Sequence, residues 1–121
     1  MRNRTAILCL TIAVLLGSVG VSASADFQKG LTAYKSGNYV TALREWTPLA
    51  EQGIARAQFN LGVMYAGGNG VLQDYKTAVK WYRLAAEQGH ASAQFNVGLM
   101  YDQGRGVPQN YKTAVKWWKL A

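Results

Sequence analysis

Apolar residues recur at helical spacing through the middle of the chain. They fall at Ala57, Leu61, Met64 and Tyr65, which is the i, i+4, i+7, i+8 pattern of an amphipathic helix. Glycines end this run, because glycine readily adopts the positive φ of a turn. A second helical series follows Asp74, which stands at an N-cap position. This series consists of Tyr75, Ala78, Val79, Tyr82, Ala85 and Ala86, with Gly89 placed to cap its end.

The same pattern of residues occurs twice in the chain. When residues 54–85 are shifted by 36 positions onto residues 90–121, 21 of 32 aligned positions are identical. A period of this length indicates a solenoid of stacked repeats. Residues 26–53 form a divergent first copy with a shorter loop between its two helices. Because the apolar stripes are too large to bury within one helix pair, we predict an all-α array of three hairpins that complete one another's core.

The first 25 residues are typical of a secretory signal peptide. Two arginines precede an apolar run, and the Ala-Ser-Ala sequence at residues 23–25 fits a cleavage signal. The run falls short of the roughly 20 residues that a spanning helix needs. We therefore expect cleavage after Ala25, no stable membrane insertion after cleavage, and a mature protein in the periplasm or secreted. Cys9, the one cysteine, lies in this segment, so the mature chain should contain no disulfide.

The chain is basic. Its formal net charge is +7, and loss of the two arginines of the leader would leave +5. Since exported proteins rarely meet nucleic acid, we interpret the charge as a source of solubility and of attraction to anionic envelope surfaces, with no nucleic-acid partner.

Several short motifs, repeated in phase, resemble the Sel1-like repeat, a relative of the tetratricopeptide repeat with a longer inter-helix loop. They are Leu61-Gly62, Gly68-x-Gly70-Val71, Asp74-Tyr75, Ala78, Trp81, Ala85-Ala86 and Gly89. On this basis residues 54–89 form one Sel1-like repeat. Residues 90–121 form a second one, truncated at its C-terminus because it lacks the closing Ala-Glu-Gln-Gly, and residues 26–53 are closer to an ordinary tetratricopeptide unit.

The resemblance implies a short right-handed α-solenoid of antiparallel helical hairpins that serves as an adaptor for other proteins. In bacteria such proteins are often secreted or placed in the cell envelope. The family supplies no active site. Some secreted relatives carry a disulfide in each repeat, and the cysteines for it are missing here.

The resemblance also implies where a partner would bind, because the first helix of each tetratricopeptide hairpin lines the concave side. A phenylalanine three residues before the helical glycine and an aliphatic residue one after it share one face of that helix, with polar residues beside them. The candidate partner-binding residues are therefore Phe27, Leu31, Arg56, Phe59, Val63, Phe95, Leu99, Asp102 and Gln103. The alternative is that the phenylalanines pack between adjacent units.

Other recurring residues are better explained by packing. Gly62 and Gly98 stand in mid-helix at a cost of about 1 kcal/mol each relative to alanine, which indicates close contact with a second helix. We expect Ala78 and Ala114 to be their partners. Large amphipathic rings at fixed repeat positions are expected to be core pillars, and these are Trp81, Trp117, Tyr65 and Tyr101.

The chain offers little for catalysis. His90, the one histidine, is expected at the surface, and the acidic residues occupy caps and helix ends without a pair suited to acid–base work. We predict no catalytic residue, no metal site and no cofactor.

The leading hypothesis is an exported interaction module that binds a protein or peptide along the inner face of the solenoid. One alternative is a cell-wall-acting hydrolase of the repeat family, and another is a truncated fragment of a longer repeat protein. The last helix leaves Trp117, Trp118 and Leu120 without a following unit, which suggests self-association there.

Overall fold

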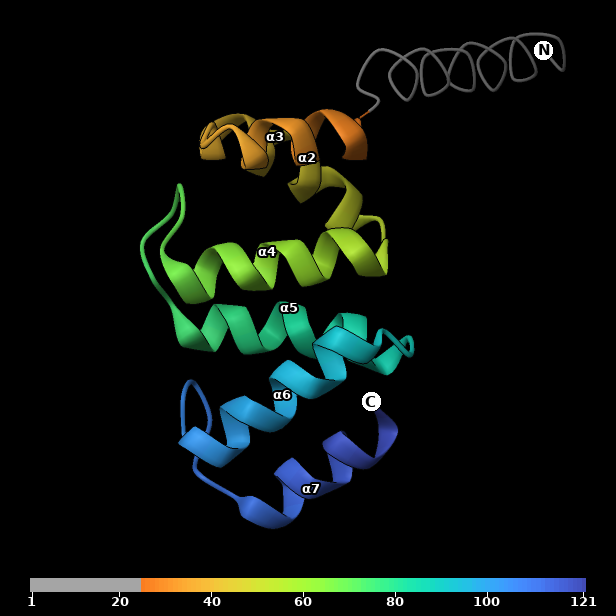
Figure 1. Ribbon diagram of the computed structural model, residues 1–121, viewed down its shortest axis with the longest axis vertical. Coiled ribbons are helices and arrows are strands. Elements are labelled where there is room, and N and C mark those ends of the chain that lie inside the picture. Colours follow the sequence, from red (N-terminus) through yellow and green to blue (C-terminus); the bar gives the residue numbers. More distant parts are fainter. Residues whose placement is uncertain (1–24) are drawn as a thin grey trace, which may run out of the picture.

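Helices make up most of residues 25–121, the part of the chain that this computed structural model describes. Residues 1–24 of the proposed leader, Cys9 among them, lie outside the described part, and Ala25, its last residue, lies within it. Within it the helices follow one another down a stack (Figure 1). They are α2 (Phe27–Lys35), α3 (Tyr39–Glu51), α4 (Ala55–Gly67), α5 (Tyr75–Glu87), α6 (Ala91–Gln103) and α7 (Tyr111–Leu120). No strand occurs in this range, so the all-α solenoid is confirmed.

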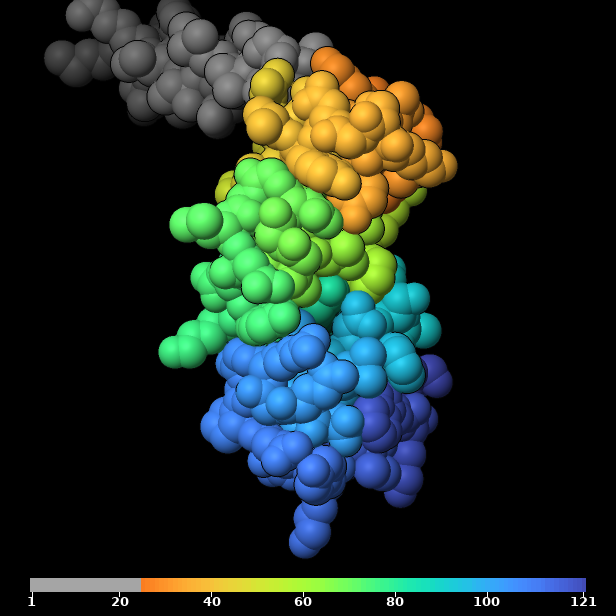
Figure 2. Space-filling view, turned by 60° about the vertical axis from the view of Figure 1, so that its left-hand side comes forward, coloured from red at the N-terminus to blue at the C-terminus, as the bar shows by residue number. Residues whose placement is uncertain are grey.

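Each helix packs mainly on its neighbours in the sequence, as expected of a quasi-one-dimensional array. Figure 2 shows the units in chain order along one elongated body, with the first unit at one end and the third at the other. The three hairpins are α2–α3, α4–α5 and α6–α7, and we call them units one, two and three.

The helix boundaries follow from local chemistry. Asp74 accepts a hydrogen bond from the backbone N–H of Thr77, which confirms it as the N-cap of α5. Gly68 and Gly104 end α4 and α6 in the left-handed conformation, with φ of 68° and 65°. The predicted cap Gly89 is displaced by one position. Gln88 is the C-cap of α5, and Gly89 follows it with φ of 89°.

The core consists of two clusters, and each joins a second helix to the first helix of the next unit. One cluster places Trp46 of α3 against Leu61 and Met64 of α4. The other places Tyr82 of α5 against Val97 and Met100 of α6. The hairpins therefore complete their cores by stacking, as the breadth of their apolar stripes predicted.

The helical glycines face aromatic rings, so the pairing with Ala78 and Ala114 was wrong. A Cβ added at Gly62 would clash with the ring of Tyr82, and one added at Gly98 would clash with Trp118. Gly30 stands in the same relation to Trp46. In each unit an aromatic side chain of the second helix crosses the first helix at its glycine. We call this side chain the crossing ring of the unit, and the three are Trp46, Tyr82 and Trp118.

Two of these rings, Trp46 and Tyr82, are more deeply buried than the aromatic residues that the sequence pattern indicated, whereas Trp118 is half-buried. Trp46 is 1% exposed and Tyr82 is 4% exposed. The selected residues Trp81, Trp117, Tyr65 and Tyr101 are half-buried and pack against the edges of the two clusters.

Candidate functional site

The predicted phenylalanines do not form a free apolar ladder. Each lies beside the crossing ring of its own unit, with ring centroids 5.7 Å apart for Phe27 and Trp46 and 5.7 Å apart for Phe59 and Tyr82. Phe95 lies 6.4 Å from Trp118 by the same measure. The rings are thus part of the packing within each hairpin.

The next unit covers two of these rings, as the alternative interpretation expected. Cζ of Arg56 lies 4.0 Å from the centroid of the Phe27 ring, which is cation–π geometry. The His90 ring stacks on Phe59 at 4.7 Å with an interplanar angle of 25°. Phe95 is 49% exposed. The Phe27 and Phe59 rings are therefore covered by different residues of the following unit.

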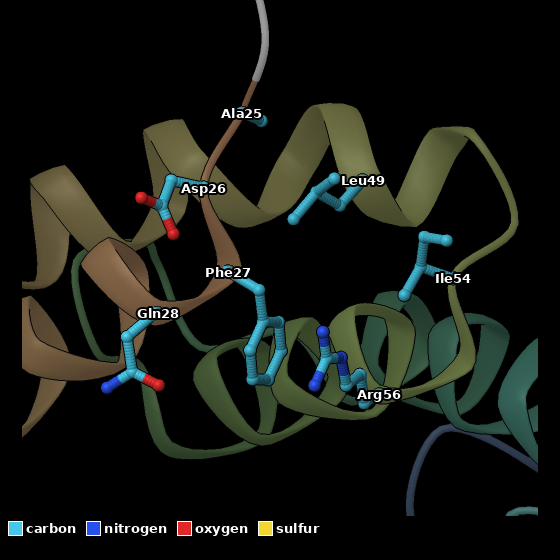
Figure 3. Close-up of a pocket in the computed structure, with 7 residues that line it drawn as sticks. All are labelled: Ala25, Asp26, Phe27, Gln28, Leu49, Ile54 and Arg56. Carbon is cyan, nitrogen blue, oxygen red and sulfur yellow. The ribbon is translucent and has the colours of Figure 1, made fainter.

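An open hollow of about 430 Å³ lies at the junction of units one and two. Phe27 and Arg56 lie side by side on one side of it, with Leu49 and Ile54 across from them (Figure 3). The remaining lining comes from the start of the described chain, namely Asp26, Gln28 and Ala25, the last of which the mature chain would lack after cleavage of the proposed leader. Two of the nine predicted partner-binding residues, Phe27 and Arg56, are thus brought together by chain segments 29 positions apart.

Within residues 25–121 the guanidinium group of Arg56 forms no salt bridge with a carboxylate. Among residues 25–121 the one ion pair is Lys29 with Glu45 at 3.6 Å. The Asp26 carboxylate accepts a hydrogen bond from the Lys29 backbone N–H as the N-cap of α2. The hollow therefore combines apolar walls with a cation that can donate several hydrogen bonds.

His90 occupies the equivalent place at the second junction, where its ring covers that of Phe59. It is half-buried rather than a free surface residue, which corrects our expectation. Its Nδ1 accepts a hydrogen bond from the backbone N–H of Ala93, 3.2 Å away, so the ring caps α6 and lies over Phe59. The equivalent residue one repeat earlier is Ile54, which begins α4 without a side-chain cap.

The other predicted residues are dispersed. Leu31 and Val63 are half-buried and pack against the core clusters. Leu99 and Gln103 line a smaller hollow of about 170 Å³ between α4, α5 and α6. Asp102 is half-buried. The structure thus divides seven of the nine predicted residues between two hollows and the packed core, whereas Phe95 and Asp102 belong to neither.

Titratable groups in the described range show structural roles. Burial raises the pKa of Tyr82 to about 12, because desolvation disfavours the charged phenolate. The pKa of Asp74 is lowered, chiefly because the Thr77 hydroxyl donates a hydrogen bond to its carboxylate.

Residues 25–121 hold no group of three or more His, Cys, Asp or Glu placed to bind a metal ion. In the same range no helix has the length and apolar character needed to cross a bilayer.

Two buried glutamines were missed by the sequence analysis. Nε2 of Gln58 donates to the carbonyl oxygen of Ala50, and Nε2 of Gln94 donates to that of Ala86, at 3.1 Å in both cases. Each bond ties the first helix of one unit to the end of the preceding unit. Their identity across the 36-residue period was the available signal, but a glutamine beside apolar residues is ordinarily interpreted as exposed.

The fold defines a helical repeat protein built from stacked hairpins. A family model described as the Sel1 repeat matches residues 55–90 and 91–121, more than half of the chain. The chain belongs to the Sel1 repeat family. This repeat commonly mediates protein–protein interaction, and its fold is generally non-catalytic.

Solved structures agree with this assignment. A Sel1 repeat protein from Oxalobacter formigenes is 38% identical, with a TM-score of 0.75 over 78% of this chain. A protective antigen present in uropathogenic Escherichia coli strains is 37% identical, with a TM-score of 0.75 over 88% of this chain. The chain spans 39% and 24% of the lengths of these two proteins. Comparison with curated proteins gave no match.

Proposed function

We propose that this chain is an exported interaction module that binds a segment of a partner protein on the inner face of the solenoid, carried by α2, α4 and α6. The hollow beside Phe27 and Arg56 would be the principal contact. It is this hollow that carries the proposal, because the equivalent place at the next junction is closed by His90.

The chemistry of the hollow selects a kind of ligand. Leu49, Ile54 and the Phe27 ring offer apolar contact for one side chain of a peptide. Arg56 offers a planar, permanently charged donor that suits a carboxylate. An apolar residue next to a carboxylate, from an acidic side chain or a chain terminus, would satisfy both features.

A peptide selection tests the binding proposal. Peptides selected from a random library on the wild-type protein should bind Arg56→Gln about tenfold more weakly, since a hydrogen bond to a charged group contributes about 1.5 to 3 kcal/mol. Arg44→Gln is the matched control, because Arg44 is also an exposed helical arginine and the charge change is the same. Equal binding by wild type and Arg56→Gln would show that the hollow is not the site.

Export has its own support and its own test. The support is the sequence of the first 25 residues, with their basic start, apolar run and Ala-Ser-Ala end. Intact-mass measurement of the protein recovered outside the cytoplasm should give a chain that begins at Asp26. A chain that retains the apolar run would indicate an anchor instead.

Self-association at the last helix is a separate proposal, and the residues that support it differ in part from those that the sequence indicated. Trp117 and Trp118 are half-buried, and Nε1 of Trp118 donates to the carbonyl oxygen of Phe95 in its own unit. Leu120, 65% exposed, and Val115, 43% exposed, are the better candidates for contact between copies. Sedimentation should show a concentration-dependent dimer that Leu120→Glu abolishes, and a monomer at every concentration would rule it out.

A further inference from the structure

A second surface, on the second helices of units two and three, has a different chemistry from the hollow at Phe27. On α5 the residues Lys76, Lys80 and Arg83 stand at i, i+4 and i+7, so they share one helix face. They surround an open hollow of about 390 Å³ whose other lining residues are Val79, Leu84, Gly106 and Val107. This volume lies within the range of about 300 to 1,000 Å³ that ligand sites occupy.

The loop of unit three shapes this hollow. Gly106 adopts φ of 72°, and a Cβ there would clash with the backbone of Tyr75 at the start of α5. This close approach places Val107 at the edge of the hollow, beside Val79 and Leu84. The apolar floor is therefore built from two units and is fixed by backbone contact.

Within the described range, the three cations around the floor are not held in close ion pairs, although the Asp74 carboxylate interacts electrostatically with Lys76. None of the three cations forms a salt bridge in the described part of the chain. Arg83 donates a hydrogen bond to the hydroxyl of Tyr101, which holds the guanidinium in place without neutralising it. The acidic residues closest in sequence, Asp74 and Glu87, stand at the two ends of the α5 segment, and Asp74 serves as its N-cap.

The same face recurs on α7 and is absent from α3. Lys112, Lys116 and Lys119 occupy the equivalent positions and line an open hollow of about 410 Å³ with Val115 and Tyr111. In unit one the corresponding residues are Val40, Arg44 and Thr47, which carry one positive charge instead of three. The basic face is thus a property of units two and three rather than of the repeat as such.

From this arrangement we propose that the face of α5 with the Val107 loop, extended by α7, binds an acidic segment of a partner protein in which carboxylates alternate with large apolar side chains. The carboxylates of the segment would lie over the cationic side chains of α5 and α7, and an apolar side chain would enter the α5 hollow. Charge complementarity selects the acidic character. At the α5 hollow a protein segment fits better than a bilayer, because Val79 in the floor is 4% exposed and cannot project into lipid. On the α7 extension Tyr111 and Val115 are 61% and 43% exposed, so vesicle binding is measured as the competing outcome. This surface is independent of the binding face proposed above.

The probe is a fluorescent nonapeptide of three Glu-Glu-Leu triplets, measured by anisotropy with the full chain. Lys76→Gln/Lys80→Gln should weaken its binding about fivefold, since each exposed ion pair contributes about 0.2 to 1 kcal/mol. Lys35→Gln/Arg44→Gln is the matched control, because both residues are exposed and the charge change is identical. The control should change binding less than the α5 variant does. An equal loss in both would show attraction by net charge alone and would overturn the proposal.

Two further measurements separate the apolar and the membrane components. Glu-Glu-Gly triplets should bind more weakly than Glu-Glu-Leu triplets to the wild type, and Val107→Asn should abolish that difference. Phosphatidylglycerol vesicles should bind no more tightly than the peptide. A peptide that does not bind, or vesicles that bind more tightly with the same dependence on Lys76 and Lys80, would refute the proposal.

Discussion

The junction of units one and two and the junction of units two and three share one scaffold but expose different surfaces. In both, a buried glutamine of the later unit donates to an alanine carbonyl oxygen of the earlier unit at 3.1 Å. In both, a glycine with positive φ, 94° at Gly53 and 89° at Gly89, turns the chain into the next hairpin. In both, the loop of the later unit also contacts the second helix of the earlier unit. Gly70 lies against the backbone at the start of α3, and Gly106 lies against the backbone at the start of α5.

The junctions differ at the residues that face solvent. Ile54 and Arg56 at the first junction correspond to His90 and Ser92 at the second. The first pair leaves a hollow of about 430 Å³ with an unneutralised guanidinium, whereas His90 stacks on Phe59 and caps α6. At these two junctions, identity at the repeat period marks the residues that join the units. Departures from it at residues 54 and 56 mark where the first junction exposes a different surface from the second.

The largest expected effect comes from a change in the shared scaffold. Gly62→Leu should destabilise the array by about 3 kcal/mol, because the new side chain would occupy the space of the Tyr82 ring between the two junctions. Thermal melting followed by circular dichroism measures it. Ala91→Leu, at an exposed position of α6, is the control for adding a leucine to a helix. An unchanged melting temperature in Gly62→Leu would mean that α4 does not approach α5 at this glycine.

A smaller loss is expected from the glutamines that bridge the junctions. Gln58→Leu and Gln94→Leu each remove one of the hydrogen bonds that a carbonyl oxygen accepts, while the backbone N–H of Gly53 or Gly89 still donates to that oxygen. Each substitution should therefore cost about 0.5 to 1.5 kcal/mol. Gln58→Leu should be the more damaging of the two, because Oε1 of Gln58 also accepts from Nε2 of Gln88 at 2.8 Å. Denaturant unfolding measures both, with Gln103→Leu at an exposed position as the control. Equal and negligible losses would show that packing alone joins the units.

These cases show what the sequence could predict. Helical periodicity and the 36-residue repeat gave the hairpins, and the N-cap at Asp74 followed from its place before an apolar series. The residue opposite Gly62 could not be obtained in this way, because spacing within one helix does not determine which residue of another helix lies across from it. The hollow beside Phe27 was also hidden, since it depends on Ile54 failing to cover a ring that His90 covers one repeat later.

Alkaline pH should distinguish the crossing ring of unit two from the others. The unfolded-state pKa of tyrosine is about 10, whereas burial raises that of Tyr82 to about 12. The contribution of Tyr82 to stability should therefore be intact below pH 10 and decline as the pH rises from 10 towards 12. Unfolding curves of wild type and Tyr82→Phe should diverge across this range in favour of the variant. Parallel curves would indicate that the hydroxyl is accessible to solvent in the folded protein.

The smallest effect on stability, and the sharpest test of the comparison, is an exchange of the two junctions. Ile54→His/Arg56→Ser gives the first junction the residues of the second, and His90→Ile/Ser92→Arg does the reverse. The first exchange should stabilise α4 by about 0.5 to 1 kcal/mol through a new N-cap, and the second should cost α6 about as much.

Binding should change in the opposite sense to stability. Peptides selected on the wild type should no longer bind Ile54→His/Arg56→Ser, because a histidine ring over Phe27 would occupy the hollow and the guanidinium would be gone. His90→Ile/Ser92→Arg should open a second hollow beside Phe59, with its own guanidinium, and titration calorimetry should then show two peptides bound per chain in place of one. If neither exchange alters binding, residues 54 and 56 do not determine specificity, and the partner contacts a surface that both junctions share.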